Sequence, residues 1–386
     1  MDIITVIIPV YNMSKYLDKC LESLMNQTYK DYKIIMIDDG STDNSMEKCM
    51  KWKRRDERIT VVSQKNMGQG AARNLGVRMA ASEYITFLDA DDWWHPKYIE
   101  LMLKGTEYGK HDIILCDMVF AYADNSMISQ KISRIRLPAG IVDIANERNV
   151  LGRIRTFMCG KVYRRSLLTS YGVEQPDYPY EDLATIPYVV SKAKSIYYVP
   201  QGLYYYLRNR TDSTINNFKA LSFFPDALMA LYKRFELDRT LDKNYNHLRH
   251  LFWGQLAFIF HKIDGSFSFE NEGKAIKNRT VEVVCGCFPE LKKIMNAKFI
   301  VPSHNHYLLG ALKKLALADE AIIADETINS ADYIIRFRGE DSSNSKYEGR
   351  EVCIDSPTDF ADDEEKIMWD LADDIFYNVA LMEFLP

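Results

Sequence analysis

The sequence predicts an α/β fold whose N-terminal domain has a mainly parallel mixed sheet, followed by a helical region and a small α/β C-terminal module. Two observations support this prediction. Short apolar strands alternate with segments of helical period in the N-terminal half, and three of these strands end in polar or acidic residues. Alternation of strands and helices favours parallel strands, and ligands of such sheets bind beyond the carboxyl ends of the strands.

The first predicted strand covers residues 5–10, a β-branched run that contains Pro9 and leads into Tyr11 and Asn12. Ser14 is predicted to cap the helix that follows. The apolar residues of this helix recur at the helical period, namely Leu17, Cys20, Leu21, Leu24 and Met25. The chain therefore begins with a strand followed by an amphipathic helix.

The second predicted strand covers residues 33–37 and ends in Asp38 and Asp39, which precede a glycine turn. Ser41 or Thr42 is predicted to cap the next helix. Like the first strand, this one carries polar groups at its carboxyl end, so both sets of groups are expected at the same edge of the sheet.

The third strand covers residues 84–88 and runs directly into Asp89, Asp91 and Asp92. Carboxylates on one turn repel one another unless positive charge lies between them, which favours a divalent cation and a phosphate-bearing ligand. The alternative is that Asp92 caps the helix that follows. The three polar strand ends are expected to meet in one crevice.

Four motifs occur in order along this part of the chain: Pro9-Val10-Tyr11-Asn12, Asp38-Asp39-Gly40-Ser41, residues 66–76 and Asp89-Ala90-Asp91. Together they resemble the successive motifs of glycosyltransferase family 2, which are inverting, nucleotide-sugar-dependent enzymes of the GT-A fold. The resemblance covers residues 1–215. It implies that Pro9 and Tyr11 pack on the nucleobase of the donor.

The same resemblance implies roles for three polar residues of the second and third motifs. Asp39 is expected to bind the base, and Asn66 and Arg73 to hold the nucleotide and its ribose. An acidic acceptor suits a base N–H, and in a dry cleft a missing partner costs about 1–3 kcal/mol. Taken singly, such residues are also compatible with turn and surface positions.

The expected cofactor is a divalent cation, Mn²⁺ or Mg²⁺. By resemblance Asp89 contacts the ribose and Asp91 binds the ion, and Asp89 is a second candidate ligand. Carboxylate oxygens are the ligands that these hard cations prefer. The cation would bridge the diphosphate and take up the negative charge that grows on the leaving nucleotide.

Residues 159–168 resemble the segment in which family members place a lysine near the donor phosphates and the acceptor, which makes Lys161 a candidate donor-binding residue. Its basic neighbours are Arg153, Arg155, Arg164 and Arg165. This cluster is compatible with contact to an anionic membrane or a lipid diphosphate, and equally with a solvated charged face.

Glu181 and Asp182 follow a turn rich in proline and match the Glu-Asp pair of the family, in which the aspartate is the general base. Inversion requires a carboxylate on the face of the sugar opposite the leaving nucleotide. Asp182 is therefore the expected base, and Glu181 is expected to orient the acceptor. The alternative is that both acids favour the N-terminus of a helix over residues 183–192.

Residues 203–207 form an aromatic strand, and the loop that follows resembles the basic loop that closes over the diphosphate in many family members. Arg208, Arg210 and Ser213 are the candidate phosphate ligands, because an arginine fork matches phosphate oxygens and a serine hydroxyl adds a neutral donor. The tyrosines of the strand are interpreted as sheet packing.

Composition narrows the protein class. A net charge of −5 argues against general nucleic-acid binding. No secretory signal is predicted, because the first strand begins within a few residues of Met1, and the apolar stretch over 251–260 is too short to span a membrane. Seven scattered cysteines fit a reducing compartment. A cytoplasmic location is expected, with peripheral contact at the inner face of the membrane left open.

The predicted domains are a glycosyltransferase domain over 1–215, a helical region over 216–298 and a small α/β module over 299–386. Strands are expected at 321–323, 333–337 and 351–354. A final acidic helix is predicted from its apolar stripe, which consists of Ile367, Leu371, Ile375 and Val379. The role of the module and the oligomeric state, including a homo-oligomer, stay open.

These features predict an inverting, metal-dependent glycosyltransferase. It would move a sugar from a nucleotide diphosphate-sugar, with a UDP-sugar as the first choice, to a hydroxyl of a glycan or lipid-linked glycan in bacterial surface polysaccharide synthesis. One alternative is a sugar-phosphate nucleotidyltransferase, which would need a glycine-rich, lysine-bearing first loop. Another is a nucleotide-sugar-binding protein without turnover.

Overall fold

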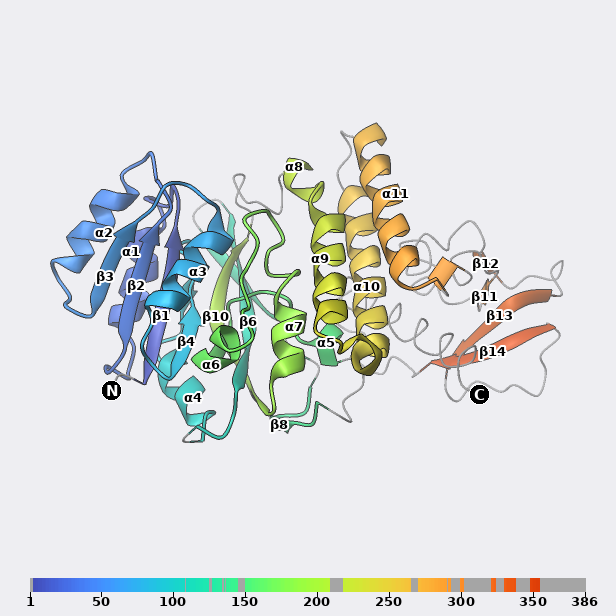
Figure 1. The fold of residues 1–386 in the computed structure, drawn as a ribbon, viewed down its shortest axis with the longest axis horizontal. Coiled ribbons are helices and arrows are strands. Elements are labelled where there is room, and N and C mark those ends of the chain that lie inside the picture. Colours follow the sequence, from blue (N-terminus) through green and yellow to red (C-terminus); the bar gives the residue numbers. More distant parts are fainter. Residues whose placement is uncertain are drawn as a thin grey trace. The chain divides into compact units, whose positions relative to one another are not determined.

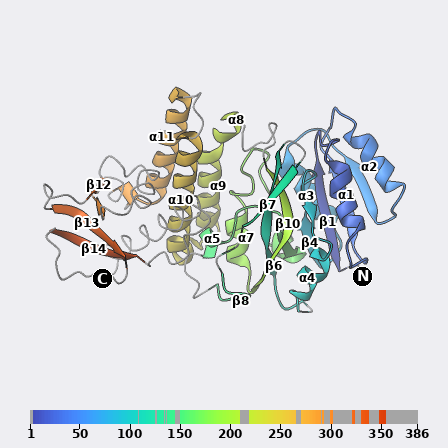
Figure 2. The same cartoon turned by 180° about the vertical axis from the view of Figure 1, so that it is seen from behind.

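A computed structural model gives the architecture of the protein (Figures 1 and 2). It describes residues 3–107, 109–124, 127–133, 135, 137–144, 150–208, 218–264, 270–289, 291–292, 299–301, 321–323, 330–337 and 348–354. The chain divides into two compact units, Met1–Thr240 and Leu241–Pro386.

The N-terminal unit begins with the predicted alternation of strands and helices. Its first elements are β1 (Ile4–Val10), α1 (Leu17–Met25), β2 (Lys33–Asp38), α2 (Ser45–Lys53), β3 (Ile59–Ser63), α3 (Gln69–Met79), β4 (Tyr84–Phe87), β5 (Trp93–Trp94) and α4 (Tyr98–Lys104). The three strands predicted near the N-terminus are thus confirmed. The short β5, which pairs with the aromatic strand, was not predicted.

The second half of this unit is less regular. Its elements are β6 (Ile113–Asp124), β7 (Met127–Ser133), β8 (Gly140–Val142), α5 (Val150–Arg153), β9 (Lys161–Arg164), α6 (Arg165–Thr169), α7 (Ile186–Lys192), β10 (Ile196–Arg208), α8 (Phe218–Leu221) and α9 (Phe224–Leu237). The predicted aromatic strand is the carboxyl-terminal half of β10.

One sheet joins these strands in the order β3-β2-β1-β4-β9-β6-β10-β5, with β7 on β6 and β8 on β10. Strands β1, β2, β3, β4, β6 and β10 run in one direction, and β5, β7, β8 and β9 oppose them. The predicted α/β class with a mainly parallel mixed sheet is confirmed. The polar ends of the parallel strands lie at the carboxyl edge of this sheet.

Helices cover both faces of the sheet, with α3 in front in Figure 1 and α1 in front in Figure 2. Alternate residues of β1 explain this arrangement, since successive side chains of a strand point to opposite faces. Val6 and Ile8 belong to the apolar core that α1 completes. Ile7 faces α3, where a Cβ added at Gly76 would lie 2.4 Å from the Ile7 side chain. The glycine lets the helix approach the sheet closely.

The capping predictions for the first two helices were wrong. Helix α1 is preceded by Tyr16, and α2 by Asn44, and neither residue makes a side-chain cap hydrogen bond. Ser14 instead donates its backbone N–H to Asp43 Oδ2 at 3.1 Å. The Asp43 Oδ1 atom accepts the Ser45 N–H at 2.9 Å, so it satisfies the first N–H of α2.

The predicted caps Ser41 and Thr42 join the two strand-end loops. Asn12 donates its N–H to Ser41 Oγ at 3.1 Å, and its Oδ1 accepts the Thr42 N–H at 2.8 Å. Asn12 has a φ of 54°, a left-handed conformation that asparagine tolerates better than most residues. Side chains that favour caps in isolation thus serve here to fix the carboxyl edge of the sheet.

The C-terminal unit begins with the helices α10 (Leu241–Asp264) and α11 (Glu270–Cys287). The helical character predicted after residue 218 is confirmed. Phe288 packs edge-on against Tyr245 and Phe252, with ring centroids 5.0 and 5.2 Å apart. Aromatic contacts of this kind add to the hydrophobic burial that holds the two helices together.

Four parallel strands complete what the structure describes of this unit: β12 (Ala321–Ile323), β11 (Phe299–Val301), β13 (Ser330–Phe337) and β14 (Glu348–Ile354), in that sheet order. The three predicted strands are confirmed, although β13 and β14 begin three residues earlier than expected, and β11 was not predicted. The predicted helix bearing Ile367 and Val379 lies outside the described residues.

None of the helices in the described part of the chain combines the length and the apolar character that crossing a membrane requires.

Candidate active site

The carboxylate of Asp39, which follows β2 and is almost fully buried, organises the loop before α3. It accepts hydrogen bonds from Gln64 Nε2 at 2.7 Å, from the Met67 N–H at 2.9 Å and from the Gly68 N–H at 2.9 Å. A carboxylate has about four lone-pair sites, so one remains for a further donor. Asp39 thus joins the second and third motifs.

The other residues of the predicted base site differ in their burial. Pro9 lies buried within β1, opposite Ile37 of β2, so its ring is part of the sheet. Tyr11 is 43% exposed and has room to contact a ligand. Asn66 is exposed, and its backbone N approaches Gly40, where an added Cβ would lie 2.9 Å away. Gly40 has a φ of 73°, which also favours glycine.

Arg73 is buried in α3 and joins two motifs that are far apart in the sequence. Its guanidinium donates to Asp89 Oδ1 at 2.8 Å and to Glu181 Oε1 at 2.7 Å. Burial alone would lower the pKa of Arg73, but the two carboxylates outweigh burial and raise it. Both of these charge partners are acidic side chains of this protein, so the guanidinium acts as an internal bridge.

The turn after β4 contacts the hydroxyl of Tyr204 through Asp89 and Asp92. The Tyr204 hydroxyl donates to Asp92 Oδ2 at 2.6 Å and accepts the Asp89 N–H at 3.2 Å. Asp92 Oδ1 accepts the Leu207 N–H at 2.8 Å, so Asp92 connects this turn to the end of β10. The alternative role of Asp92 as a helix cap is wrong, because Lys97 precedes α4.

Negative charge is concentrated at this turn. Burial raises the pKa of Asp92 well above its usual range, and the neighbouring carboxylates of Asp91 and Asp89 raise it further. A bound cation would offset this repulsion. Among the described residues, the ligand atoms of Asp89, Asp92 and Cys159 lie within 4.8 Å of one another. The oxygen donors fit Mn²⁺ or Mg²⁺, whereas the thiol is a softer ligand.

Lys161 begins β9 and is buried, with Cys159 of the cluster described above and Asp182 among its neighbours. Its Nζ donates to the Phe157 carbonyl oxygen at 2.5 Å. Burial lowers the pKa of Lys161 to about 8, the Arg155 guanidinium acts in the same direction, and the Asp182 carboxylate opposes them. A buried cation next to another cation favours an anionic ligand, because such a ligand would restore the balance of charge. Arg164, in contrast, pairs with Glu83 at 2.6 Å, away from this cluster.

Asp182 lies beside Glu181 at the end of a turn in which Tyr180 has a φ of 68°. A tyrosine in this conformation is strained, and such strain persists only where the surroundings fix it. Asp182 Oδ1 accepts the Leu183 N–H at 2.7 Å, and α7 begins only at Ile186. The pKa of Asp182 is raised to about 7, first by burial and then by the Glu181 carboxylate, while Arg73 acts in the opposite direction.

Of the predicted phosphate ligands, Arg208 ends β10, where its guanidinium lies 4.4 Å from the Phe120 ring centroid and 5.4 Å from that of Tyr206. Cation–π contacts of this kind hold the side chain over the aromatic cluster. Arg210 and Ser213 lie outside the described residues.

Three residues of the site were not predicted as such. Tyr204 was interpreted as sheet packing, yet its hydroxyl contacts two carboxylate residues. Cys159 lies at the acidic cluster, with its Sγ 3.7 Å from Asp89 Oδ2. Gln69 donates to Asp89 Oδ1 at 3.0 Å. Each is placed by contacts between distant strands or loops, which no spacing in the sequence indicates.

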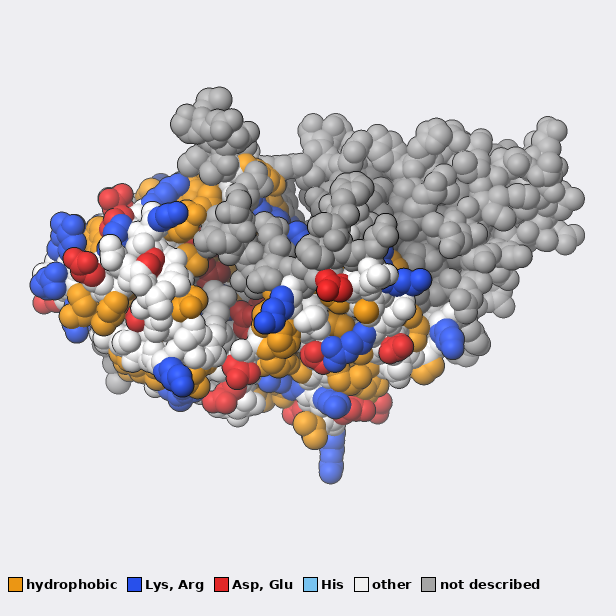
Figure 3. All heavy atoms as spheres, turned by 90° about the horizontal axis from the view of Figure 1, so that it is seen from above, with side chains coloured by type: hydrophobic (Ala, Val, Ile, Leu, Met, Phe, Trp, Pro, Cys, Tyr) orange, Lys and Arg blue, Asp and Glu red, His pale blue; other side chains and the backbone are white. Residues whose placement is uncertain are grey.

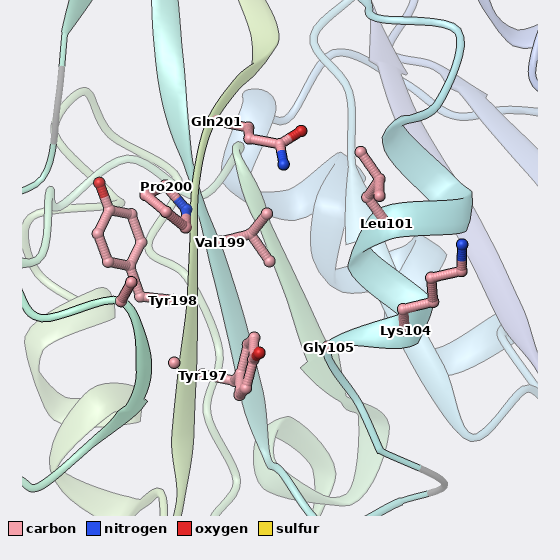
Figure 4. A pocket seen from close by; sticks show the side chains of 10 residues that line it. Leu101, Lys104, Gly105, Tyr197, Tyr198, Val199, Pro200 and Gln201 are labelled. Atoms are coloured by element: carbon pink, nitrogen blue, oxygen red, sulfur yellow. The ribbon is translucent and has the colours of Figure 1, made fainter.

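A hollow of about 260 Å³ lies elsewhere in this unit, between the first half of β10 and α4 (Figure 4). Leu101, Lys104, Tyr197 and Gln201 are among the residues that line it. None of the predicted site residues belongs to this lining, so the hollow is separate from the candidate active site.

On the face shown in Figure 3, basic and acidic side chains of the described residues are interspersed and form no extended patch of one sign.

The first turn of α3 packs against residues 175–177 so closely that only glycine fits at one position. A Cβ added at Gly70 would lie 2.1 Å from the Pro176 carbonyl oxygen. Gly70→Ala should therefore lower the free energy of unfolding by about 1–3 kcal/mol, the usual cost of overpacking. Denaturant unfolding followed by circular dichroism measures the change. Gly254→Ala in α10, where nothing lies within 4 Å, is the control and should be neutral or stabilising; equal stability of Gly70→Ala and the parent would contradict the packing.

Part of this chain is similar to known proteins. Residues 5–171 match the sequence model of the family described as glycosyl transferase family 2. EpsH of Bacillus subtilis, named a putative glycosyltransferase, is 33% identical over 177 residues, which are 45% of this chain and 50% of EpsH. Glycosyltransferase GlyA of Streptococcus pneumoniae is 48% identical over 103 residues, which are 27% of this chain and 15% of GlyA. The chain spans half or less of the length of these two relatives.

Solved structures with a similar fold include S. aureus TarS 1-349 in complex with UDP, with a TM-score of 0.48 and 17% identity over 75% of this chain and 91% of that one. Mannosyltransferase PcManGT from Pyrobaculum calidifontis, in complex with GDP-Man and Mn²⁺, has a TM-score of 0.43 and 14% identity over 76% and 74% of the two chains. The family match confirms the resemblance found in the sequence.

Proposed function

We propose that this chain, in which residues 5–171 form a glycosyl transferase family 2 domain, transfers one sugar from a nucleotide diphosphate-sugar to a hydroxyl of a glycan with inversion at the anomeric carbon. A UDP-sugar is the proposed donor. A growing or lipid-linked glycan of a bacterial surface polysaccharide is the proposed acceptor.

The observation that carries this proposal is the bridge made by Arg73. One guanidinium contacts both Asp89 of the acidic turn and Glu181 of the Glu-Asp pair, at 2.8 and 2.7 Å. The groups proposed for the donor and the group proposed for the acceptor are therefore held in one site. Transfer needs this proximity, because the attacking hydroxyl and the leaving nucleotide must lie on opposite faces of one sugar.

Asp182 is the proposed general base. It would take the proton of the acceptor hydroxyl while the oxygen attacks the anomeric carbon, and the bond to the nucleotide diphosphate breaks in the same step. The raised pKa of Asp182, about 7, suits this task, because a base works best when its pKa is near the working pH. Glu181 would help to orient the acceptor and, through Arg73, the base.

Donor binding is proposed to use Pro9, Tyr11, Asp39 and Asn66 for the nucleoside, and Lys161, Arg208, Arg210 and Ser213 for the diphosphate. Arg73 and Asp89 would complete the ribose side of the donor site. Asp91, with Asp89, would hold Mn²⁺ or Mg²⁺. When bound, the cation supplies positive charge to the diphosphate as it leaves. The buried ammonium of Lys161 would contribute to the same stabilisation.

The rate should depend on pH through Asp182 and Lys161. The base acts only when ionised, so kcat/KM should fall below pH of about 7, and it should fall again above about 8 as Lys161 loses its charge. Initial rates across this range at low donor concentration measure the profile. In Lys161→Arg the upper limb should move to higher pH, because the guanidinium stays charged. A flat profile would contradict both assignments.

Thermal denaturation with a panel of nucleotide sugars tests the donor class. A ligand at about 100 times its Kd stabilises the folded state by about 2.7 kcal/mol, which shifts the melting temperature measurably. One donor should stabilise the full chain in the presence of Mn²⁺, and its nucleoside diphosphate should do so too. Absence of any shift across the panel would overturn the proposed donor class.

Two alternatives make different demands on the sequence. A sugar-phosphate nucleotidyltransferase would need a glycine-rich, lysine-bearing loop where this chain has Pro9-Val10-Tyr11-Asn12. A binding protein without turnover would not need a base, and Asp182 has the environment of one. Both alternatives are therefore less well supported than transfer.

A cytoplasmic location, with peripheral contact to a membrane that carries the acceptor, is part of the proposal. The arginines around Lys161 provide one argument for contact with an anionic lipid diphosphate, because burial of Lys161 beside Arg155 favours an anion nearby.

The division into a glycosyltransferase domain, a helical region and a C-terminal α/β module is proposed to separate donor chemistry from acceptor use or assembly, with homo-oligomers as one form of assembly. Nucleic acid is not a proposed partner.

A further inference from the structure

Residues 175–182, the segment that ends in Asp182, pack against α3. Its first residues approach the glycines of the third motif. An added Cβ would lie 2.1 Å from the Pro176 oxygen at Gly70, and 3.0 Å from the Asp177 oxygen at Gly68. The backbone of this segment therefore lies directly on the start of α3.

Asn74, one turn farther along α3, fixes this contact with two hydrogen bonds. Its Nδ2 donates to the Gln175 carbonyl oxygen at 2.8 Å, and its Oδ1 accepts the Gln175 N–H at 3.0 Å. The side-chain amide thus pairs with one residue's backbone as another strand would. Gln175 is 5% exposed, and backbone groups at such a buried position need partners.

The other end of the segment is held by the Arg73–Glu181 ion pair, at 2.7 Å. Between the two anchors the chain passes through Tyr180, whose left-handed φ of 68° is unfavourable for tyrosine. The Tyr180 ring packs edge-on against Phe224, with centroids 5.0 Å apart. Strained backbone between two anchors is expected to shift when one anchor is lost.

We propose that Asn74 is a positioning residue for the transfer reaction: by pairing with the backbone of Gln175 it holds the segment 175–182, and with it the carboxylate of Asp182, in the geometry that removes the acceptor proton. This inference rests on the proposed function. Asn74 acts through Asp182, because its two hydrogen bonds go to the backbone of Gln175, whereas the donor loop is held by Asp39.

The test compares Asn74→Ala with Gln175→Ala in the full chain. Asn74→Ala removes both hydrogen bonds to the backbone. Gln175→Ala keeps them and removes only a side-chain contact to Arg73, at 3.3 Å. Asn44→Ala, at an exposed asparagine without a side-chain cap bond, controls for asparagine loss as such.

Asn74→Ala should lower kcat by about 10- to 100-fold, the size of effect expected when a reacting group is misplaced by about 1 Å. The Kd of the donor nucleotide, measured by calorimetry, should stay within about twofold of the parent, because the Asp39 contacts remain. Gln175→Ala and Asn44→Ala should keep most of the activity. Asn74→Asp, which keeps the acceptor but loses the donor, should resemble Asn74→Ala and serves if the alanine variant does not fold.

Hydrogen exchange supplies a readout that does not depend on turnover. Amides of residues 175–183 should exchange faster in Asn74→Ala than in the parent, and in Gln175→Ala they should not. An unchanged kcat in folded Asn74→Ala, unchanged exchange in this segment, or an equal loss of donor affinity and rate would overturn the proposal. If the parent itself transfers no sugar, the proposed function fails, whereas the exchange result still decides whether Asn74 holds the segment.

Discussion

Replacing Asp182 by asparagine should abolish most of the transfer activity while the protein still folds and binds its donor. The amide matches the carboxylate in shape but cannot accept the acceptor proton, and loss of a general base typically costs about 10²–10⁴-fold in rate. The environment of Asp182 makes the folded state tolerant of this change. Its pKa is raised to about 7, mainly by burial, so the site already favours the neutral form of this side chain.

The measurement is initial-rate kinetics at saturating donor, together with calorimetry of the nucleotide. Asp177→Asn, at an exposed aspartate five residues away in the same segment, is the matched control and should behave like the parent. If Asp182→Asn turns over at nearly the parental rate, another group is the base and the assignment is wrong.

Replacing Asp91 by alanine should abolish transfer and also the dependence of nucleotide affinity on Mn²⁺. Asp91 is proposed as a direct ligand of the cation, and the neighbouring carboxylates raise the pKa of Asp92 well above its usual range, after the larger effect of burial. Without the ion, the diphosphate would meet uncompensated carboxylates, so its affinity should fall toward the value measured with a chelator.

Calorimetry of the nucleoside diphosphate, with Mn²⁺ and with a chelator, gives both affinities for each variant. Asp31→Ala, at an exposed aspartate just before β2, controls for the loss of one negative charge. An Asp91→Ala variant whose nucleotide affinity still rises with Mn²⁺ to the parental extent would show that other residues hold the ion. Asp89 and Asp92 would then be the next candidates, since their ligand atoms cluster with that of Cys159.

The sheet could be predicted because each strand is identified by the pattern of residues within that strand. Strand β1 has seven consecutive buried residues, and β4 is apolar up to the acidic turn, so period and composition identify both. Parallel order then brings the polar strand ends to one edge. The sequence therefore predicted that the polar strand ends, with Asp39 and Asp89, lie at one edge of the sheet.

The contacts within the site were not predictable in this way. Arg73 and Glu181 are 108 residues apart, and Tyr204 and Asp92 are 112 apart. Nothing in the local sequence indicates that Arg73 also bridges two carboxylates from distant parts of the chain. The same limit explains the wrong helix caps, because the Ser41 hydroxyl meets Asn12 only after β1 and β2 have paired.

Product analysis tests the central claim most directly. The full chain would be incubated with Mn²⁺ and the nucleotide sugar that stabilises it, with and without a glycan acceptor, and the released phosphates separated by chromatography. Sugar transfer predicts that nucleoside diphosphate is released, faster with acceptor, and that Asp182→Asn and Asp91→Ala release almost none. Release of pyrophosphate in a reaction that includes sugar phosphate and nucleoside triphosphate would indicate a nucleotidyltransferase, and donor binding without any product would indicate a binding protein; either result would contradict the account.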